Sequence, residues 1–293
     1  MTICNYFLAR SPHLVNGKSL NSPIYLLVDN GSLEAGSTLN LRNAARLIER
    51  AAKVPIYPVS LLHSSKVEPE KLAGVPALTM DVFLRGAIGQ SSNELRVVPF
   101  FFGPSRALTQ WLPGKLEEWK SDKNGRSYRI LGSLYDAGDN RLALALEELS
   151  LQVMQREGLS FPFLALVDHG TPVLDVHRVR EEVGAELKVR MNGRISGFST
   201  CSMERREGEE YDFNEPLLEN LLAGIKGKFE EVLVAQLFLS PGRHAGEGGD
   251  LDAICSSFTD GSSIRRIFRT ELLGDHPLVM KIILERIRED LEG

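Results

Sequence analysis

The feature that most constrains the fold of this chain is an internal duplication. Residues 24–31 read IYLLVDNG, and residues 163–170 read FLALVDHG. Each stretch is an apolar run that ends in Val-Asp-X-Gly, which is the pattern of a strand buried on both faces that stops at a glycine turn. Self-similarity of this kind indicates two copies of one structural unit, so it limits the architecture more than any single motif.

Three further matches follow in the same order in both halves. Each Glu-Pro pair precedes a short apolar segment, where proline suits the first turn of a helix. An apolar strand then enters a loop with Pro-X-Arg, and last a Gly-Asp loop opens an amphipathic segment. The matched ranges are 68–69 with 215–216, 96–107 with 233–245, and 135–149 with 272–287. Four matches in one order predict two tandem domains.

We place the domain boundary near residues 156–160, which gives domains of 22–157 and 158–293. With 293 residues and 43% hydrophobic content, the chain can bury a core in each. Each half reads as four strands that alternate with helices, including helices at 174–186 and 278–291. This alternation predicts an α/β fold, a mainly parallel sheet with helices on both faces. The charged stretch 194–213 is expected to replace a regular second strand of the second domain.

Composition excludes several classes of function. The formal net charge of -5 provides no broad basic field, so binding to nucleic acid or to an anionic membrane surface is disfavoured. No apolar run approaches the roughly 20 residues that span a bilayer. The three cysteines, Cys4, Cys201 and Cys255, are too few and too scattered for a disulfide framework, and their odd number is typical of a reducing compartment. We therefore predict a cytoplasmic protein.

The two halves differ at three histidines. A residue that serves packing should recur at the equivalent place, but these three do not. The pairs are His169 with Asn30, His244 with Ala107, and His276 with Asn140. All three histidines follow the end of a predicted strand, and in parallel α/β sheets such loops meet at the edge where ligands bind. The sequence thus predicts that imidazoles gather on one side of the second domain.

The histidines differ in how much supports a functional role. Joint placement favours His169 and His244, whereas His276 precedes Pro277 and could instead cap a helix. His177 would lie two turns into a helix, and His13 and His63 belong to regions with no supporting pattern, so we interpret these three as structural.

Neutral imidazole is a common ligand for Fe, Co, Ni and Zn. Because the two main histidines are far apart in sequence, no zinc-finger spacing applies, and the fold itself would have to build the site. Two or three protein ligands would leave coordination positions open for a substrate, which suits catalysis better than structure. A nearby carboxylate would help to desolvate the cation. The candidates are Glu204, Glu207, Glu209, Glu210 and Glu247, although an acidic run is more often a solvated loop.

Three segments of the second half together resemble one family. They are HGTP at 169–172, LFLSPGRHA at 237–245 and LGDHPL at 273–278. These segments resemble the CbiX-type sirohydrochlorin chelatases, a family of class II chelatases, in their two-domain form. The first half resembles that family only weakly. The resemblance implies two tandem chelatase-like, flavodoxin-like domains, of which the first is degenerate and lacks the histidines.

The resemblance also implies an activity. Such enzymes insert cobalt, iron or nickel into sirohydrochlorin-type tetrapyrroles on the way to sirohaem or cobalamin. The family's first metal-binding histidine falls on His169 and its second on His244, with His276 as a further candidate. The divalent metal is then a substrate, and no organic cofactor is expected. General chemistry agrees, because metallation removes two N–H protons and neutral imidazole can accept them.

A tetrapyrrole of this type carries several carboxylates, which an acidic protein can bind only through local cations. The candidates are Arg243, Arg194 and Arg205, with Arg206 beside them. Arginine matches carboxylates bidentately. Glycines in 246–249 could donate backbone N–H groups to an anion or simply allow the loop to move. The first domain is expected to be a lid or packing partner, in a monomer with an internal pseudo-dimer or in a homodimer.

The sequence leaves one rival function open and disfavours three others. A non-catalytic tetrapyrrole- or metal-binding protein on the same scaffold stays open. Histidine phosphatases need an arginine before the histidine, and here that residue is Asp168. Nucleotide binding is disfavoured because neither first turn has Gly-X-Gly-X-X-Gly, and a Gly-X-Ser-X-Gly elbow of acyl hydrolases is absent.

Overall fold

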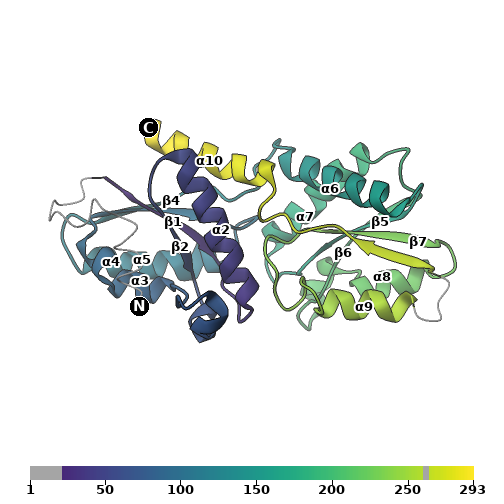
Figure 1. The fold of residues 1–293 in the computed structure, drawn as a ribbon, viewed down its shortest axis with the longest axis horizontal. Coiled ribbons are helices and arrows are strands. Elements are labelled where there is room, and N and C mark those ends of the chain that lie inside the picture. Colours follow the sequence, from purple (N-terminus) through teal and green to yellow (C-terminus); the bar gives the residue numbers. More distant parts are fainter. Residues whose placement is uncertain (1–21, 260–263) are drawn as a thin grey trace. The chain divides into compact units, whose positions relative to one another are not determined.

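The computed structural model describes residues 22–259 and 264–293, and these form two compact units (Figure 1). The first unit ends at Asp136 and also takes in Met280–Gly293, while the second covers Ala137–Val279. Each described unit contains one four-stranded sheet, and every pair of neighbouring strands is parallel. The predicted α/β class with two similar domains is confirmed.

In the first unit the strand order is β2-β1-β3-β4. Its elements are β1 (Ile24–Asp29), α2 (Ala35–Ala52), β2 (Ile56–Ser60), the short 3-10 turns η2 (Ser64–Lys66) and η3 (Pro69–Leu72), α3 (Met80–Arg85), α4 (Ala87–Ser91), β3 (Glu94–Pro99), the π-helical turn η4 (Ala107–Trp111), α5 (Leu112–Ser121) and β4 (Ser127–Ile130). Helices α3, α4 and α5 bury one face of this sheet in an apolar core.

In the second unit the order is β6-β5-β7-β8, which is the same topology. Its elements are α6 (Arg141–Glu157), β5 (Phe163–Asp168), α7 (Leu174–Arg190), β6 (Gly197–Ser202), the 3-10 turn η5 (Glu209–Asn214), α8 (Leu218–Ile225), β7 (Glu231–Gln236), α9 (Asp250–Thr259) and β8 (Arg266–Arg269), followed by α10 (Pro277–Glu292). Figure 1 shows α6 and α7 on one face of the sheet and α8 and α9 on the other.

The central strands are apolar because both of their faces are covered. All six residues of β1 and all six of β5 are buried. Burial of this kind is expected for parallel strands between two helical layers, and it explains why these two segments show no alternation of polar and apolar residues. Each of the two strands ends at a buried aspartate, Asp29 or Asp168.

The last helix of each sequence copy belongs to the other unit. Helix α6 lies in the second unit, and most of α10 lies in the first. Asp290 of α10 is almost fully buried there, where Tyr25 donates a 2.7 Å hydrogen bond to it and Arg96 and Arg129 form ion pairs with it. The units therefore differ from the consecutive ranges 22–157 and 158–293. Helix α6 does end at Gly158, which adopts the left-handed conformation at the helix terminus.

Two expectations about local structure were wrong. Strand β6 is regular, although the stretch 194–213 was expected to replace it. The sequence hides this strand because β6 lies at the sheet edge and its first four residues are only half-buried, so no apolar run marks it. The Glu-Pro match also fails. Ser202 donates its N–H to the carbonyl of Pro216, but in the first unit Ser60 donates to Leu78, so Pro69 is not the structural counterpart.

No helix among residues 22–259 and 264–293 is long and apolar enough to cross a bilayer.

Candidate metal centre

His169 is placed by the sharp turn that follows β5. The next residue, Gly170, has a φ of +92°, and a Cβ there would lie 1.8 Å from the carbonyl oxygen of Glu204. Only glycine allows both this conformation and this close approach. His169 Nδ1 lies 3.2 Å from the carbonyl oxygen of Gly170, while the side chain is 59% exposed. The turn thus presents the imidazole at the carboxyl edge of the sheet.

Glu204 follows the end of the neighbouring strand β6. Its N–H donates to the carbonyl of His169 at 3.2 Å, and the N–H of Met203 donates to the carbonyl of Asp168 at 2.9 Å. These two bonds continue the ladder between β5 and β6 past the strand ends. They bring Glu204 beside His169 from the next strand over.

His244 comes from the loop between β7 and α9. Its carbonyl accepts from the N–H of Leu251 at 3.1 Å, and the carbonyl of Arg243 accepts from the N–H of Asp250 at 3.1 Å. These bonds fold the loop back onto the first turn of α9. The imidazole of His244 is buried, with Nδ1 2.8 Å from Oδ2 of Asp250.

The three side chains converge. The ring centroids of His169 and His244 are 4.5 Å apart, and the ring planes meet at 73°. Oε1 of Glu204 lies 3.8 Å from Nδ1 of His169, and Oε2 lies 3.5 Å from Nε2 of His244. One ligand atom from each residue lies within 4.8 Å of the others, so the set can surround one ion. We refer to His169, Glu204 and His244 as the metal triad.

The surroundings of His244 favour its neutral form. Burial lowers its pKa, and the neighbouring His169 lowers it further, although Glu204 and Asp250 act in the opposite direction. Neutral imidazole is the form that binds a metal. Because Glu204 is half-exposed and His169 more so, one side of the triad is open to a further ligand. Two imidazoles and a carboxylate suit divalent Fe, Co, Ni or Zn.

A buried arginine, Arg180, contacts the end of the strand that precedes His169. Arg180 is 1% exposed and donates to Oδ1 of Asp168 at 3.3 Å, to the carbonyl of Asn214 at 3.4 Å and to that of Phe213 at 3.2 Å. Asp168 also accepts from the N–H of Gly170 at 3.1 Å. This network connects η5 to the end of β5, directly before His169.

The first unit lacks all three ligands at the equivalent positions. Asn30 stands in place of His169. The N–H of Leu62 donates to the carbonyl of Asn30, just as the N–H of Glu204 donates to the carbonyl of His169. Ala107 stands in place of His244 and packs against the core. The glycine turn is nevertheless kept, because a Cβ on Gly31 would lie 1.8 Å from the carbonyl of Leu62. The scaffold is common to both units, and the ligands belong to the second.

His276, the third candidate ligand, does not join the triad. It is buried just before α10, its Nδ1 accepts from the N–H of Leu278 at 3.3 Å, and its Nε2 lies 3.4 Å from Glu148. It therefore caps the helix, the alternative considered for it. His177 lies beside Arg180 and Phe213 in the second unit, and His63 is exposed in the first. His13, like Cys4, lies outside the described residues.

The three candidate arginines lie in different places. Arg243 is 79% exposed and lies beside the triad, with Nε 3.3 Å from Oδ2 of Asp250. Arg205 instead closes its own loop through ion pairs with Asp212 and Glu215. Arg194 precedes β6 at the amino edge of the sheet and pairs with Glu147 at 3.2 Å, so it is remote from the triad. The structure therefore does not bring Arg194 together with the metal triad.

Sequence reasoning did not single out Glu204 from the acidic candidates. Glu207, Glu209 and Glu210 are exposed residues of the following loop and of η5. The signal that distinguishes Glu204 is its position two residues after the end of β6, which becomes visible only once that strand is recognised. Cys201 is buried near the same strand end, as expected of a packing residue, and burial raises the pKa of its thiol.

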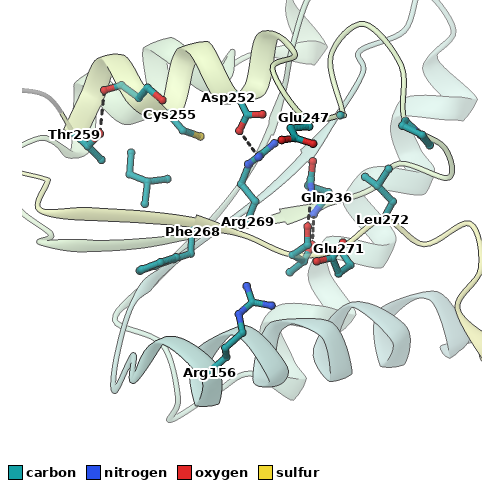
Figure 2. Close-up of a pocket in the computed structure, with 15 residues that line it drawn as sticks. Arg156, Gln236, Glu247, Asp252, Cys255, Thr259, Phe268, Arg269, Glu271 and Leu272 are labelled. Atoms are coloured by element: carbon teal, nitrogen blue, oxygen red, sulfur yellow. Dashed lines mark hydrogen bonds and ion pairs between the residues drawn. The ribbon is translucent and has the colours of Figure 1, made fainter. Parts of the chain in front are cut away.

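A cavity of about 570 Å³ is lined in part by Pro241, Gly246 and Glu247, which belong to the loop that carries His244 (Figure 2). It is lined by Gln236 and Thr270 at strand ends, by Phe268, and by charged side chains from several elements. The charged lining residues are Glu247, Asp252, Glu271, Arg156 and Arg269. Figure 2 shows the guanidinium of Arg269 turned toward Asp252, with which it forms an ion pair. With carboxylates in excess, this cavity does not suit a polycarboxylate ligand.

Comparison with known proteins identifies solved structures of similar fold. No family model and no curated protein matches the chain. Among solved structures, SirB from Bacillus subtilis with Fe³⁺ has a TM-score of 0.67 at 14% identity, over 92% of this chain and 95% of that one. The sirohydrochlorin chelatase SirB from B. subtilis subspecies spizizenii in complex with cobalt has a TM-score of 0.64 at 13% identity, with 92% and 96% covered.

A third solved structure agrees. CbiX, described as the terminal enzyme for biosynthesis of siroheme in denitrifying bacteria, has a TM-score of 0.60 at 16% identity, over 92% of this chain and 99% of that one. All three likenesses span nearly the full length of both chains. This chain therefore has the fold of the CbiX-type class II chelatases.

Proposed function

We propose that this protein inserts a divalent metal ion, Co²⁺, Fe²⁺ or Ni²⁺, into a sirohydrochlorin-type tetrapyrrole. The observation that carries the proposal is the metal triad, in which His169, Glu204 and His244 converge on one open point. The fold supports it, because solved structures of similar fold are sirohydrochlorin chelatases, one with Fe³⁺ and one with cobalt.

The triad supplies what metal insertion requires. The metal replaces two pyrrole protons, so the reaction consumes one M²⁺ and releases two H⁺. His169 and His244 hold the ion with Glu204, whose carboxylate offsets part of its charge during desolvation. As the ion passes to the ring nitrogens, each imidazole is freed to accept one of the protons, as a general base near neutral pH.

Arg243 is the cation that we assign to a substrate carboxylate. It is largely exposed and lies next to His244, so its guanidinium can turn to an anion held above the triad. Arg205 serves the loop that holds Glu204, since both of its carboxylate partners lie in that loop or at its end.

The test measures the absorbance change when purified protein is mixed with sirohydrochlorin and Co²⁺. We expect His169→Ala and His244→Ala each to slow insertion by at least about 100-fold, the range that a lost general base accounts for. The matched control is His276→Asn, because asparagine also caps helices and occupies the corresponding helix start, at Asn140, in the first copy. This variant should insert metal at the wild-type rate. Unchanged rates in both alanine variants, or wild-type protein that binds metal and tetrapyrrole without product, would contradict the proposal.

A further inference from the structure

We propose that Asp250 is a positioning residue that fixes the orientation of the His244 imidazole, an inference that rests on the proposed function. Oδ2 of Asp250 lies 2.8 Å from Nδ1 of His244. An ionised carboxylate has no proton to give, so the negative charge of Asp250 favours the tautomer in which Nδ1 carries the imidazole proton. The lone pair then belongs to Nε2, the nitrogen that lies 3.5 Å from Glu204 within the metal triad.

The local fold holds Asp250 in this place. Asp250 is the first residue of α9. Its N–H donates to the carbonyl of Arg243, and the N–H of Leu251 donates to the carbonyl of His244. A Cβ on Gly249 would lie 2.9 Å from both of these carbonyl oxygens, so the loop needs glycine directly before Asp250. The backbone therefore holds Asp250 and His244 next to each other, within reach of the side-chain contact.

Arg243 approaches the same carboxylate from a second direction. Its Nε lies 3.3 Å from the same Oδ2 atom that faces His244. Asp250 is thus held between a guanidinium and an imidazole, although its own side chain is 43% exposed. Both cationic or N–H-bearing neighbours face the same oxygen, so their attraction favours the side-chain position in which Oδ2 lies beside Nδ1 of His244.

The first unit offers an internal contrast. Where His244 is replaced by Ala107, the chain enters the helical turn Ala107–Trp111 at once and continues into α5. The second unit inserts the loop up to Gly249 before its helix begins at Asp250. The loop that brings a carboxylate to the imidazole therefore occurs in the unit that has the imidazole, which is expected if the two act together.

The expected consequence is a loss of metal affinity. A metal-bound histidine depends on the partner of its other nitrogen for its tautomer, its orientation and its basicity, and removing such a partner costs about 10–100-fold in affinity. In Asp250→Ala, the His244 ring can rotate and both tautomers become accessible. Asp250→Glu restores the carboxylate on a longer side chain and should recover part of the affinity.

The experiment has two readouts, the Co²⁺ dissociation constant from visible absorption and the His244 tautomer from imidazole ¹⁵N NMR of metal-free protein. The matched control is Asp175→Asn, because Asp175 also lies in the first turn of a helix and pairs with an arginine, Arg178, but contacts no imidazole. We expect about 10–100-fold weaker Co²⁺ binding and a mixed tautomer in Asp250→Ala, with neither change in the control.

Equal Co²⁺ affinity and an unchanged Nδ1–H tautomer in Asp250→Ala would overturn the inference. Failure of the proposed function looks different, because wild-type protein would then bind no Co²⁺ or insert none. The tautomer of metal-free His244 still tests the role of Asp250 in that case.

Discussion

Replacing Arg180 with leucine is expected to destabilise the second unit by about 3 kcal/mol near pH 8, with a much smaller loss in acid. The variant removes the buried guanidinium that faces Asp168 at 3.3 Å. Removing one partner of a buried ion pair typically lowers the free energy of unfolding by about 3–5 kcal/mol, since the remaining charge is buried without a partner.

The first unit shows what the variant should resemble. Leu41 stands twelve residues after Asp29, as Arg180 stands twelve residues after Asp168, and it is fully buried. Without a cation, burial raises the pKa of Asp29 from 3.8 to about 6, although hydrogen bonds from Ser60 and other groups oppose the shift. A shift of about two units corresponds to about 3 kcal/mol at 1.36 kcal/mol per unit.

The direction of the pH dependence follows from that shift. A carboxyl group with a raised folded-state pKa holds a proton in the folded state that the unfolded chain has already lost. Its destabilising effect is therefore absent below about pH 4, grows between about pH 4 and 6, and is complete above that range. Asp168 in the Arg180→Leu variant should follow this course.

Denaturant unfolding at about pH 5 and about pH 8 measures the effect, with Arg178→Leu as the control. Arg178 lies on the same helix but is 61% exposed, and an exposed ion pair such as its contact with Asp175 contributes at most about 1 kcal/mol. A loss in Arg180→Leu that is the same at both pH values, or no larger than that of the control, would refute the reasoning.

Three further outcomes follow from single residues. Gly170→Ala should displace Glu204 and weaken Co²⁺ binding more than about 10-fold, whereas Gly193→Ala, which also has a positive φ but open space around it, should leave binding unchanged. Asp29→Asn should raise the free energy of unfolding by up to about 3 kcal/mol near pH 8 but not near pH 4, because only the ionised carboxylate is destabilised by burial. Equal gains at both pH values would contradict this cause. Burial raises the pKa of Cys255 to about 11, so its thiol should react with iodoacetamide near pH 8 much more slowly in folded than in unfolded protein. Peptide-level mass spectrometry measures the two alkylation rates. Equal rates would contradict this expectation.

The central strands could be predicted because burial on both faces leaves an unbroken apolar run. The segments that end at Asp29 and Asp168 are of this kind, and the chain repeats them. Strand β6 gave no such signal because an edge strand needs fewer apolar residues. The exchange of α6 and α10 was also hidden, since an amphipathic pattern shows which face of a helix is buried but not which sheet covers it.

The approach of His169 to His244 could be anticipated from the internal comparison, because both follow strands that end at one edge of the sheet. The place of Glu204 could not be anticipated, since the sequence offered five equivalent glutamates. Only the hydrogen bonds that continue the β5–β6 pairing past the end of β6 distinguish Glu204 from the others. The distance of Arg194 from the triad was hidden for the same reason, because without β6 its place at the opposite edge was not evident. His276 was left undecided by sequence, and its bond to the N–H of Leu278 assigns it to the helix terminus.

The most direct test is the anomalous scattering of cobalt in crystals grown with Co²⁺. We predict one strong peak within about 2.0–2.2 Å of an imidazole nitrogen of His169, an imidazole nitrogen of His244 and a carboxylate oxygen of Glu204. Cobalt bound elsewhere, or a fully occupied crystal in which either imidazole turns away from the ion, would contradict the account.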